Sequence, residues 1–291
     1  MVLKAISPGE AKPTKVKMLI SGDPGSGKST FALNWPKPYL IDAEQGCVRK
    51  EYQDKLKEVG GAYFGVAQGA GSFQNVIEEV KTLSTEKHDF KTLIIDSFSH
   101  LYLQEAAEAE ERIGSDFGKD RKEANKPTRQ LMRWINKCDL NVLLLAHNKA
   151  KWVRKGNEIY QDGNTFEGYS KLEYDLDIFI EIMPGYKNFL IKKSRIKSLP
   201  QGQSMPLSFK HFAEIYGKDI IEKEVVQLEL ATPVQLKLLK EYIEVLNIDQ
   251  SKIDQWLKKA DVDSFEESTR DQIDTLLETF KKMVDKLKEK K

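Results

Sequence analysis

Residues 22–30 carry the clearest chemical pattern in the chain, a glycine-rich segment that ends in lysine and two hydroxyl residues. The segment fits the spacing G-x-x-x-x-G-K-[ST]. Glycines at these places let the backbone turn so that successive N–H groups point inward at phosphate oxygens. Lys28 would supply charge to the β- and γ-phosphates, and the Ser29 hydroxyl would be a ligand of Mg²⁺. The candidate nucleotide-binding residues are therefore Gly22, Asp23, Pro24, Gly25, Ser26, Gly27, Lys28, Ser29 and Thr30.

The surroundings of this segment are those that a phosphate-binding loop requires. Residues 17–21 form a short apolar run that is typical of a buried parallel strand. Ser29 to Trp35 is expected to be helical and to stop at Pro36. This strand–loop–helix context favours ATP with Mg²⁺ as the cofactor over the alternative, a glycine-rich turn without a ligand.

Two carboxylates follow apolar runs further along the chain. Asp96 ends the run Leu93-Ile94-Ile95, and a carboxylate at the carboxyl edge of a parallel strand points into the crevice where ligands bind. Asp96 is thus expected to hold Mg²⁺ together with Ser29, unless it only caps the next turn. Glu44 follows the strand at residues 39–42 and should face the nucleotide too; the alternative is an exposed loop carboxylate.

Strands and helices alternate through the first half of the sequence. Strands are expected at 17–21, 39–42, 63–66, 92–96 and 141–146, and helices at 29–35, 72–83, 101–113 and 127–138. This order predicts an α/β fold with a mostly parallel central sheet flanked by helices. Short strands at 176–183, 188–193 and 205–209 are expected to extend the sheet as hairpins.

The chain changes character near residue 231, where Thr232-Pro233 predicts a helix start. Helices are expected from there to about 246, at 251–260 and at 269–288, the last with a capping box from Thr269 to Gln272. We therefore expect a flexible lead-in at 1–14, an ATPase core at 15–215, a linker at 216–230 and a three-helix C-terminal module at 231–291.

Composition excludes several classes of protein. The net charge is +1, so contact with nucleic acid would need a local basic patch. Cys47 and Cys138 are far apart, which favours two buried thiols over a structural zinc site. Neither a membrane-spanning apolar run nor a signal peptide is evident, so we expect no membrane association and a cytoplasmic location.

Two segments make the similarity to a known family specific. Residues 38–46, with the sequence PYLIDAEQG, and residues 146–149, with the sequence AHNK, resemble RecA-like P-loop ATPases. Within that group the chain looks most like phage-encoded nucleotide-binding proteins of the RecA/RadA type, which assist single-strand annealing in recombination. If the protein is phage-encoded, its location is the host cytoplasm.

The resemblance implies roles for several residues beyond the phosphate loop. Glu44 would be the catalytic base that polarises the attacking water, with Asp42 as a structural neighbour. His147 would be a polar sensor of the γ-phosphate, although Asn148 could fill this role instead. Lys193 and Arg195 would be a cationic finger that reaches the neighbouring subunit's γ-phosphate in a ring or filament. A solvated basic strand end is the alternative for this pair.

A basic, aromatic segment follows the expected sensor, at the place where RecA-like proteins have a loop in the DNA channel. Its lysines and arginines could neutralise phosphates, and Trp152 or Tyr160 could stack on unpaired bases. A mobile surface hairpin is the alternative for this segment, and the basic residues 119–122 are a weaker DNA candidate. The candidate DNA-binding residues are Lys149, Lys151, Trp152, Arg154 and Lys155.

The leading hypothesis is an oligomeric ATPase that binds single-stranded DNA and promotes annealing or strand pairing. Its C-terminal helices could dock a single-strand-binding protein or serve oligomerisation. The alternatives are a helicase-like motor, a helicase-loading accessory ATPase and an ATP-switched scaffold with negligible hydrolysis. A nucleotide kinase is disfavoured because the arginines are sparse and form no lid.

Overall fold

The computed structural model describes residues 14–114, 118–156 and 158–288, so the predicted lead-in lies outside the described residues except for Thr14. The strands are β1 (Lys17–Gly22), β2 (Pro38–Asp42), β3 (Ala62–Gly65), β4 (Thr92–Asp96), β5 (Asn141–Lys155), β6 (Glu158–Phe166), β7 (Ile178–Ile182), β8 (Asn188–Ser194) and β9 (Ser204–Pro206). The helices are α1 (Lys28–Ala32), α2 (Lys50–Glu58), α3 (Phe73–Thr85), α4 (Phe98–Ile113), α5 (Lys119–Lys137), α6 (Leu172–Asp175), α7 (Phe209–Tyr216), α8 (Lys218–Glu222), α9 (Pro233–Val245), α10 (Gln250–Ala260) and α11 (Arg270–Lys288).

The chain divides into two compact units. The first unit consists of residues 1–80, 88–132 and 139–225, and it contains the whole sheet. The second unit consists of residues 226–291 together with the short segments 81–87 and 133–138. The ends of α3 and α5 thus belong to the same unit as the C-terminal helices.

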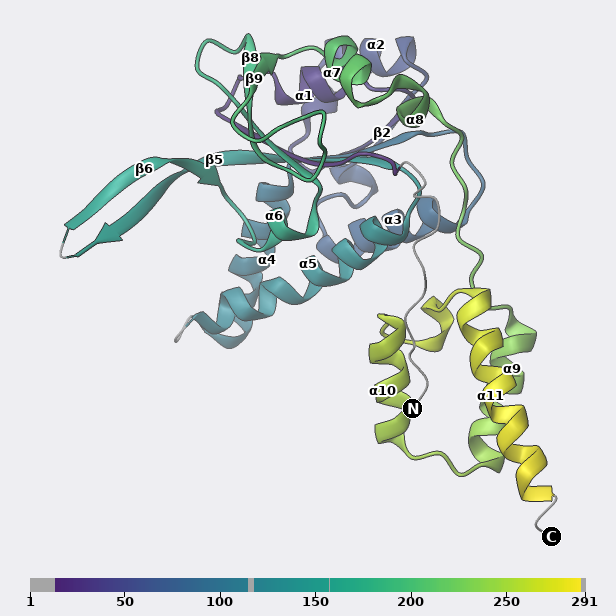
Figure 1. The fold of residues 1–291 in the computed structure, drawn as a ribbon. Helices are drawn as coiled ribbons and strands as arrows, with labels where there is room; N and C mark the ends of the chain where they lie inside the picture. The colour runs from purple at the N-terminus through teal and green to yellow at the C-terminus, as the bar shows by residue number, and fades with distance from the viewer. Residues whose placement is uncertain (1–13, 115–117, 157, 289–291) are drawn as a thin grey trace. The chain divides into compact units, whose positions relative to one another are not determined.

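The first unit is built on a sheet with the strand order β3-β2-β4-β5-β1-β7-β8-β9, and β6 pairs with β5 outside this path. The pairs from β3 to β7 are parallel, whereas β8, β9 and β6 pair in the antiparallel sense. Helices α1, α2, α7 and α8 lie on one face of the sheet, and α3, α4 and α5 lie on the other (Figure 1). The predicted α/β fold with a mostly parallel, helix-flanked sheet is confirmed.

The central strands are buried on both faces because helices cover both sides of the sheet. All five residues of β4 are buried, as are the first six of β5. Continuous burial explains why these strands are unbroken apolar runs, which sequence reasoning could find. The register sets Gly22 beside His147 and Asp42 beside Asp96, so the carboxyl ends of four strands meet at one edge.

One predicted strand is wrong in its second half. Residues 205–209 were expected to be extended, but β9 ends at Pro206 and α7 begins at Phe209. The Ser208 side chain caps this helix by accepting a hydrogen bond from the His211 N–H, as an N-cap residue does. Phe209 also packs against the fully buried Trp35, with ring centroids 5.2 Å apart. The apolar run is therefore the core-facing side of a helix.

Helix α5 begins earlier than its sequence suggests, because Pro127 lies inside it instead of at its start. Proline lacks the N–H that would bond the carbonyl four residues back. Burial of Ala124, Thr128 and Leu131 on one side of the helix offsets that loss. Helix α2 was not predicted at all, since Leu56 is its only buried side chain and its sequence therefore carries a weak apolar pattern.

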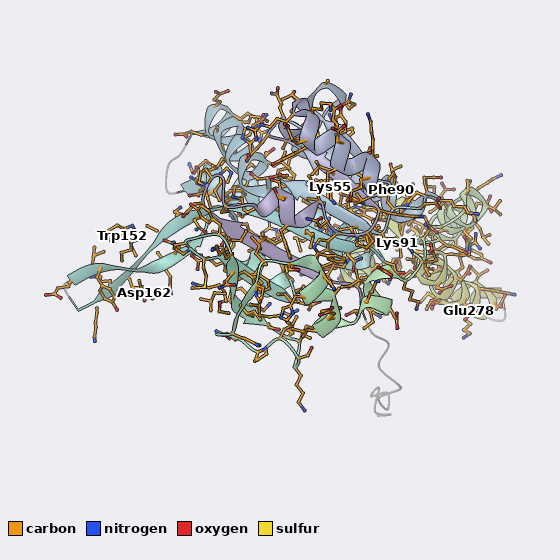
Figure 2. All side chains as sticks on the ribbon, turned by 90° about the horizontal axis from the view of Figure 1, so that it is seen from above. Lys55, Phe90, Lys91, Trp152, Asp162 and Glu278 are labelled. Atoms are coloured by element: carbon orange, nitrogen blue, oxygen red, sulfur yellow. The ribbon has the colours of Figure 1, made fainter. Side chains whose placement is uncertain are left out.

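Strand β5 continues nine residues past the predicted end at Ala146 and forms a two-stranded arm with β6. The arm projects from the sheet, and Figure 2 shows Trp152 and Asp162 on it, away from the helices (Figures 1 and 2). Few residues of the arm are buried. Its sequence is accordingly polar and lacks the apolar pattern that predicts a strand.

The second unit contains the three predicted helices, and their caps are as the sequence indicated. Thr232 and Gln235 form a capping box at the start of α9, and Thr269 and Gln272 exchange the equivalent hydrogen bonds before α11. The core of this unit is small, with Leu239, Ile273 and Phe280 fully enclosed. Across the described part of the chain, no helix combines the length and apolar character needed to cross a bilayer.

Candidate functional site

The glycine-rich segment forms a tight loop between β1 and α1. A Cβ atom on Gly22 would lie 2.5 Å from Ser26 Oγ, and Gly27 has a φ of 90°, a backbone conformation that side chains disfavour. The Lys28 ammonium donates to the carbonyl oxygens of Gly22 at 2.8 Å and Asp23 at 3.0 Å. Ser26 Oγ is buried and has no hydrogen-bond partner among the residues that the structure describes. An unpaired hydroxyl and a lysine held at the loop fit a phosphate group.

Ser29 and Asp96 meet where a magnesium ion would be expected. The Ser29 hydroxyl donates to Asp96 Oδ2 at 2.5 Å, although the two residues come from α1 and β4. Burial raises the pKa of Asp96 to about 6, and the negative charges of Glu44 and Asp42 add to this rise. Hydroxyl and carboxylate oxygens are ligands that Mg²⁺ prefers, so this donor pair fits the predicted cofactor.

Glu44 lies at the same edge, directly after β2. Its Oε1 accepts a hydrogen bond from the Ser97 hydroxyl and lies 2.9 Å from His147 Nε2. The hydrogen bond from His147 lowers the pKa of Glu44 to about 2, and the same contact raises the pKa of His147. Glu44 is therefore ionised at neutral pH, which a group that orients or deprotonates water requires.

The predicted structural role of Asp42 agrees with its contacts. Its two carboxylate oxygens accept from the backbone N–H groups of Gly46 and Cys47, each at 2.7 Å. These two bonds hold the turn after β2, on which Glu44 lies.

Both sensor candidates contact the site, each on a different partner. His147 contacts Glu44, whereas the Asn148 amide donates to Asp23 Oδ1 at 2.9 Å. The backbone N–H of His147 also donates to Ser99 Oγ at 2.9 Å, which ties β5 to the start of α4. One strand thus touches both the phosphate loop and the candidate catalytic carboxylate.

Lys193 and Arg195 lie far from the phosphate loop of their own chain. Ser194, between them, pairs with Ile178 at the amino end of β7, which is level with Met18 near the start of β1. Four strand residues separate this level from Gly22, which is about 13 Å. Within one chain the two cations therefore do not join the site that holds Lys28, Glu44 and Asp96.

The predicted DNA-binding residues lie on the arm, outside the nucleotide cluster. Lys149 forms an ion pair with Glu167 at 3.1 Å, and Lys151 forms one with Asp162 at 2.9 Å. Trp152 is 63% exposed, and Arg154 and Lys155 are exposed near the tip.

Two hydroxyl residues of the site, Ser97 and Ser99, are not among those predicted from the sequence. Ser97 holds Glu44, and Ser99 accepts from His147 N–H and donates to the Glu167 carbonyl at 2.6 Å. The sequence could have indicated them, because Ser97 and Ser99 follow Asp96, the last residue of a predicted strand. Hydroxyls just beyond a parallel strand reach the crevice where the carboxylates meet.

Comparisons with known proteins agree with this geometry at the level of the family. A solved structure described as "Structure of pCW3 conjugation coupling protein TcpA monomer form with ATPgS" is similar at 14% identity with a TM-score of 0.34. The match covers 68% of this chain and 62% of that one, so it spans less than two thirds of the neighbour's length. No curated protein sequence matches the chain.

The family comparison covers the phosphate loop, both carboxylates and the sensor strand. The model of the AAA_24 family, described as an AAA domain, matches residues 14–204, well over half of the chain. The narrower resemblance to phage annealing proteins of the RecA/RadA type stays a prediction. The chain belongs to the AAA_24 family and carries an AAA-type P-loop ATPase domain.

Proposed function

We propose that this protein is a RecA-like, oligomeric ATPase that binds single-stranded DNA and promotes annealing or strand pairing, as phage recombination proteins do. The observation that carries the hydrolytic part is the cluster of Lys28, Ser29, Asp96, Glu44 and His147 at one edge of the sheet. The DNA part is supported by the arm and by a second cationic surface.

The residues of the cluster divide the work of hydrolysis. Lys28 and the loop N–H groups hold the phosphates, and Ser29 with Asp96 would hold Mg²⁺. An ion held there would supply positive charge to the phosphates. Glu44, kept ionised, orients the attacking water and accepts its proton, while His147 links Glu44 to β5.

The arm presents a surface suited to unpaired bases. Trp152 pairs across the arm with Gln161, and Arg154 pairs with Ile159, so Trp152, Arg154 and Ile159 share one face. Trp152 is 63% exposed and Ile159 is 67% exposed. An indole ring beside a guanidinium lets a base stack while its phosphate is neutralised. The exposed ion pairs of Lys149 and Lys151 can be exchanged for phosphates at little cost.

Helix α5 provides the second cationic surface in the first unit. Lys119, Lys122, Lys126 and Arg129 are exposed at spacings of three and four residues, which places them on one side of the helix. Residues 119–122 were expected as a basic loop, but they are helical, and Arg121 lies over the Tyr102 ring at 5.8 Å. A row of cations about 15 Å long can follow a phosphate backbone.

The decisive measurement for DNA binding is titration of a labelled single strand at low and moderate salt. We expect Trp152→Ala to weaken binding about tenfold through lost stacking. Tyr174→Ala, which removes a 66% exposed ring from α6, is the matched control and should change nothing. Absence of binding at low salt, together with ATP turnover that single strands do not change, would contradict this part of the proposal.

Annealing is separated from unwinding by two fluorescence assays on the full chain with ATP. Complementary single strands should pair faster with the protein than without it, and a forked duplex should stay paired. Unwinding of the fork without faster annealing would favour the helicase-like motor instead.

A finger in trans would explain why Lys193 and Arg195 lie away from their own phosphate loop. The Arg195 guanidinium forms an ion pair with Asp177 at 3.3 Å and is exposed enough to be released. We expect Glu44→Gln and Arg195→Gln chains to be inactive alone and to regain turnover when mixed. A mixed assembly contains interfaces with an intact Glu44 from one chain and an intact Arg195 from the next. Mixtures without any recovery would contradict a shared site.

The second unit is our candidate for docking a single-strand-binding protein. A cavity of about 350 Å³ between α10 and α11 has Trp256, Phe265 and Leu276 in its walls. Leu276→Asp should abolish such an interaction in a pull-down and leave ATP turnover unchanged. Retained binding by this variant would remove the cavity from consideration.

A further inference from the structure

Helix α9 in the second unit carries apolar side chains on two opposite sides. Its inner side faces the core that this unit builds with α11, where Leu239 is fully buried (Figure 1). Its outer side presents Val234 at 76%, Leu238 at 37% and Val245 at 66% exposure. A surface helix ordinarily keeps its outer side polar, so an apolar outer side indicates a contact surface. We propose that the outer side of α9 binds the same side of a second copy of this chain, with the two helices antiparallel.

The exposed apolar residues of α9 form one stripe because of their spacing. At about 100° per residue, positions 234, 238 and 245 lie within an arc of about 40°. Single apolar residues scattered over a surface are ordinary, whereas aligned ones indicate a partner. Glu241 lies in the same stripe, four residues after Lys237, a spacing at which opposite charges pair along one helix. Because this charge loses water in the contact, we expect a reversible dimer.

The charges along the exposed side of α9 change sign halfway along the helix. Lys237 and Lys240 are exposed in the first half, and Glu241 and Glu244 are exposed in the second. Antiparallel packing brings the basic half of one copy against the acidic half of the other, whereas parallel packing would set like charges together. Lys240 also pairs with Glu266 at 3.4 Å within its own chain. The contact between copies therefore depends mainly on Lys237 and Glu244.

One two-fold axis satisfies the apolar and the charged contacts together. If Val234 faces Val245 of the second copy, the axis crosses α9 half a residue before Lys240. If Lys237 faces Glu244 of the second copy, the axis crosses half a residue after Lys240, which is only about 1.5 Å away. Lys237 and Glu244 also lie on the same edge of the stripe, about 20° apart around the helix, and the axis brings that edge against itself. The surface is therefore self-complementary, as an isologous dimer requires.

This contact differs from the surfaces that the proposed function uses. A two-fold contact closes after two copies, whereas a finger in trans needs heterologous contacts that continue from subunit to subunit. The cavity considered for a single-strand-binding protein is lined by residues between 256 and 279, which belong to α10, α11 and the segment between them. The α9 contact goes beyond the proposed function because it requires neither ATP nor DNA.

Sedimentation of the full chain without nucleotide or DNA tests the contact by exchanging charges. Lys237→Glu and Glu244→Lys each set like charges against each other twice in a dimer, so each should raise the dimer dissociation constant about tenfold or more. An equimolar mixture of the two variants should dimerise within about threefold of the unchanged chain, because both contacts then join opposite charges. Lys258→Glu, the same charge change at an exposed position of α10, is the matched control and should leave the constant unchanged.

A neutral substitution covers the case in which a reversed charge disturbs the fold. Leu238→Ser should also raise the dissociation constant about tenfold, and its melting temperature should stay that of the unchanged chain, because the side chain lies outside the core. An unchanged chain that stays monomeric at every concentration would overturn the proposal. So would a dimer that persists in Leu238→Ser, or folded charge variants whose mixture associates no better than each one alone. ATP turnover and DNA binding are not read in this experiment, so a failure of the proposed function would be a separate result.

Discussion

The two edges of the sheet in the first unit both carry buried or half-buried lysines, but in different chemical settings. At the amino edge, Lys15 donates to the carbonyl oxygens of Ile221 and Lys223, and Lys91 donates to that of Glu222 at 2.6 Å. These carbonyls belong to the end of α8, where a helix has no N–H groups of its own to satisfy them. The lysines at this edge complete the hydrogen bonding of the fold.

The carboxyl edge keeps its polar groups incompletely satisfied. Lys28 donates to two carbonyls of its own loop, and burial raises the pKa of Asp96 to about 6. Within the described part of the chain, Ser26 Oγ has no hydrogen-bond partner. Such groups lower the stability of a chain unless a ligand pairs with them. The comparison teaches that incomplete pairing, and not the mere presence of charge, separates the candidate active edge from the structural edge.

The same criterion bears on the proposed cationic finger. Lys193 donates to the carbonyls of Glu173 and Leu176, as the structural lysines of the amino edge do. Arg195 donates to the carbonyl of Tyr174 and pairs with Asp177, but its side chain is 53% exposed. If either side chain acts on a neighbouring subunit, these bonds must break on assembly. The exposed Arg195 side chain can leave its partners more easily than Lys193 can.

Substitution of Lys28 should produce the largest effect and shows the contrast between the edges most directly. Lys28→Ala removes the cation that would stabilise phosphate charge, so ATP turnover should fall by about 10²–10³-fold. The Lys28 ammonium donates to carbonyls of its own loop, whereas Lys15 joins two segments that are distant in the sequence. The melting temperature should therefore change little. Turnover assays beside a thermal scan check this, and a strongly lowered melting temperature would mark Lys28 as structural.

Glu44→Gln should have the next largest effect, because it keeps the size of the side chain but removes the base. We expect turnover to fall about 100-fold while ATP affinity stays within a few fold. Glu51→Gln, on the exposed side of α2, is the matched control and should keep full turnover. Unchanged turnover in Glu44→Gln would instead favour the ATP-switched scaffold, with hydrolysis outside its function.

The carboxyl edge could be predicted because its residues are tied to a local pattern. Lys28 and Ser29 belong to a phosphate-loop spacing, and Asp96 ends a strand that is buried along its whole length. Glu44 could be expected at this edge because it follows a strand, and parallel strands bring their carboxyl ends together. Its partners Ser97 and His147 depend on the order of strands, which places β5 next to β4. That order comes from packing, which a single sequence does not display.

Other parts could not be predicted because tertiary contacts decide them. Proline is favoured at the first position of a helix. Pro127 nevertheless lies inside α5, because the buried side of this helix continues past it. Tyr186 and Leu207 line one cavity beside the phosphate loop, and no local pattern relates these two residues. The long β5–β6 arm has a polar sequence because it packs against little besides itself.

Lys15→Met should have the opposite effect to Lys28→Ala: it should lower stability and leave the use of ATP unchanged. Lys15 is 4% exposed, and its loss removes the ammonium that donates to the Lys223 carbonyl, whereas the Ile221 carbonyl keeps the Asn141 amide as a donor at 2.9 Å. Buried acceptors without partners cost about 1–3 kcal/mol each, so the free energy of unfolding should fall by about 2 kcal/mol. The KM for ATP should stay the same, as urea unfolding and turnover assays would show. A raised KM with unchanged stability would break the contrast between the edges.

The smallest expected effect concerns the pair His147 and Glu44, and pH is the variable that reveals it. Glu44 raises the pKa of His147 above its ordinary 6.5, so this part of the stability is fully present below 6.5 and is lost as the pH rises through the folded value. The pKa of Glu44 is lowered from 4.5 to about 2, so its part is present above 4.5 and is lost as the pH falls toward 2. The pair should therefore stabilise the fold most between pH 4.5 and 6.5.

His147→Gln isolates this contribution, which should stay below about 1 kcal/mol because both side chains are more than a third exposed. The difference in unfolding free energy between the unchanged chain and this variant should be larger at about pH 5.5 than at about pH 8.5. A His147→Gln difference that is equal at both values would show that the contact with Glu44 does not depend on the histidine's charge.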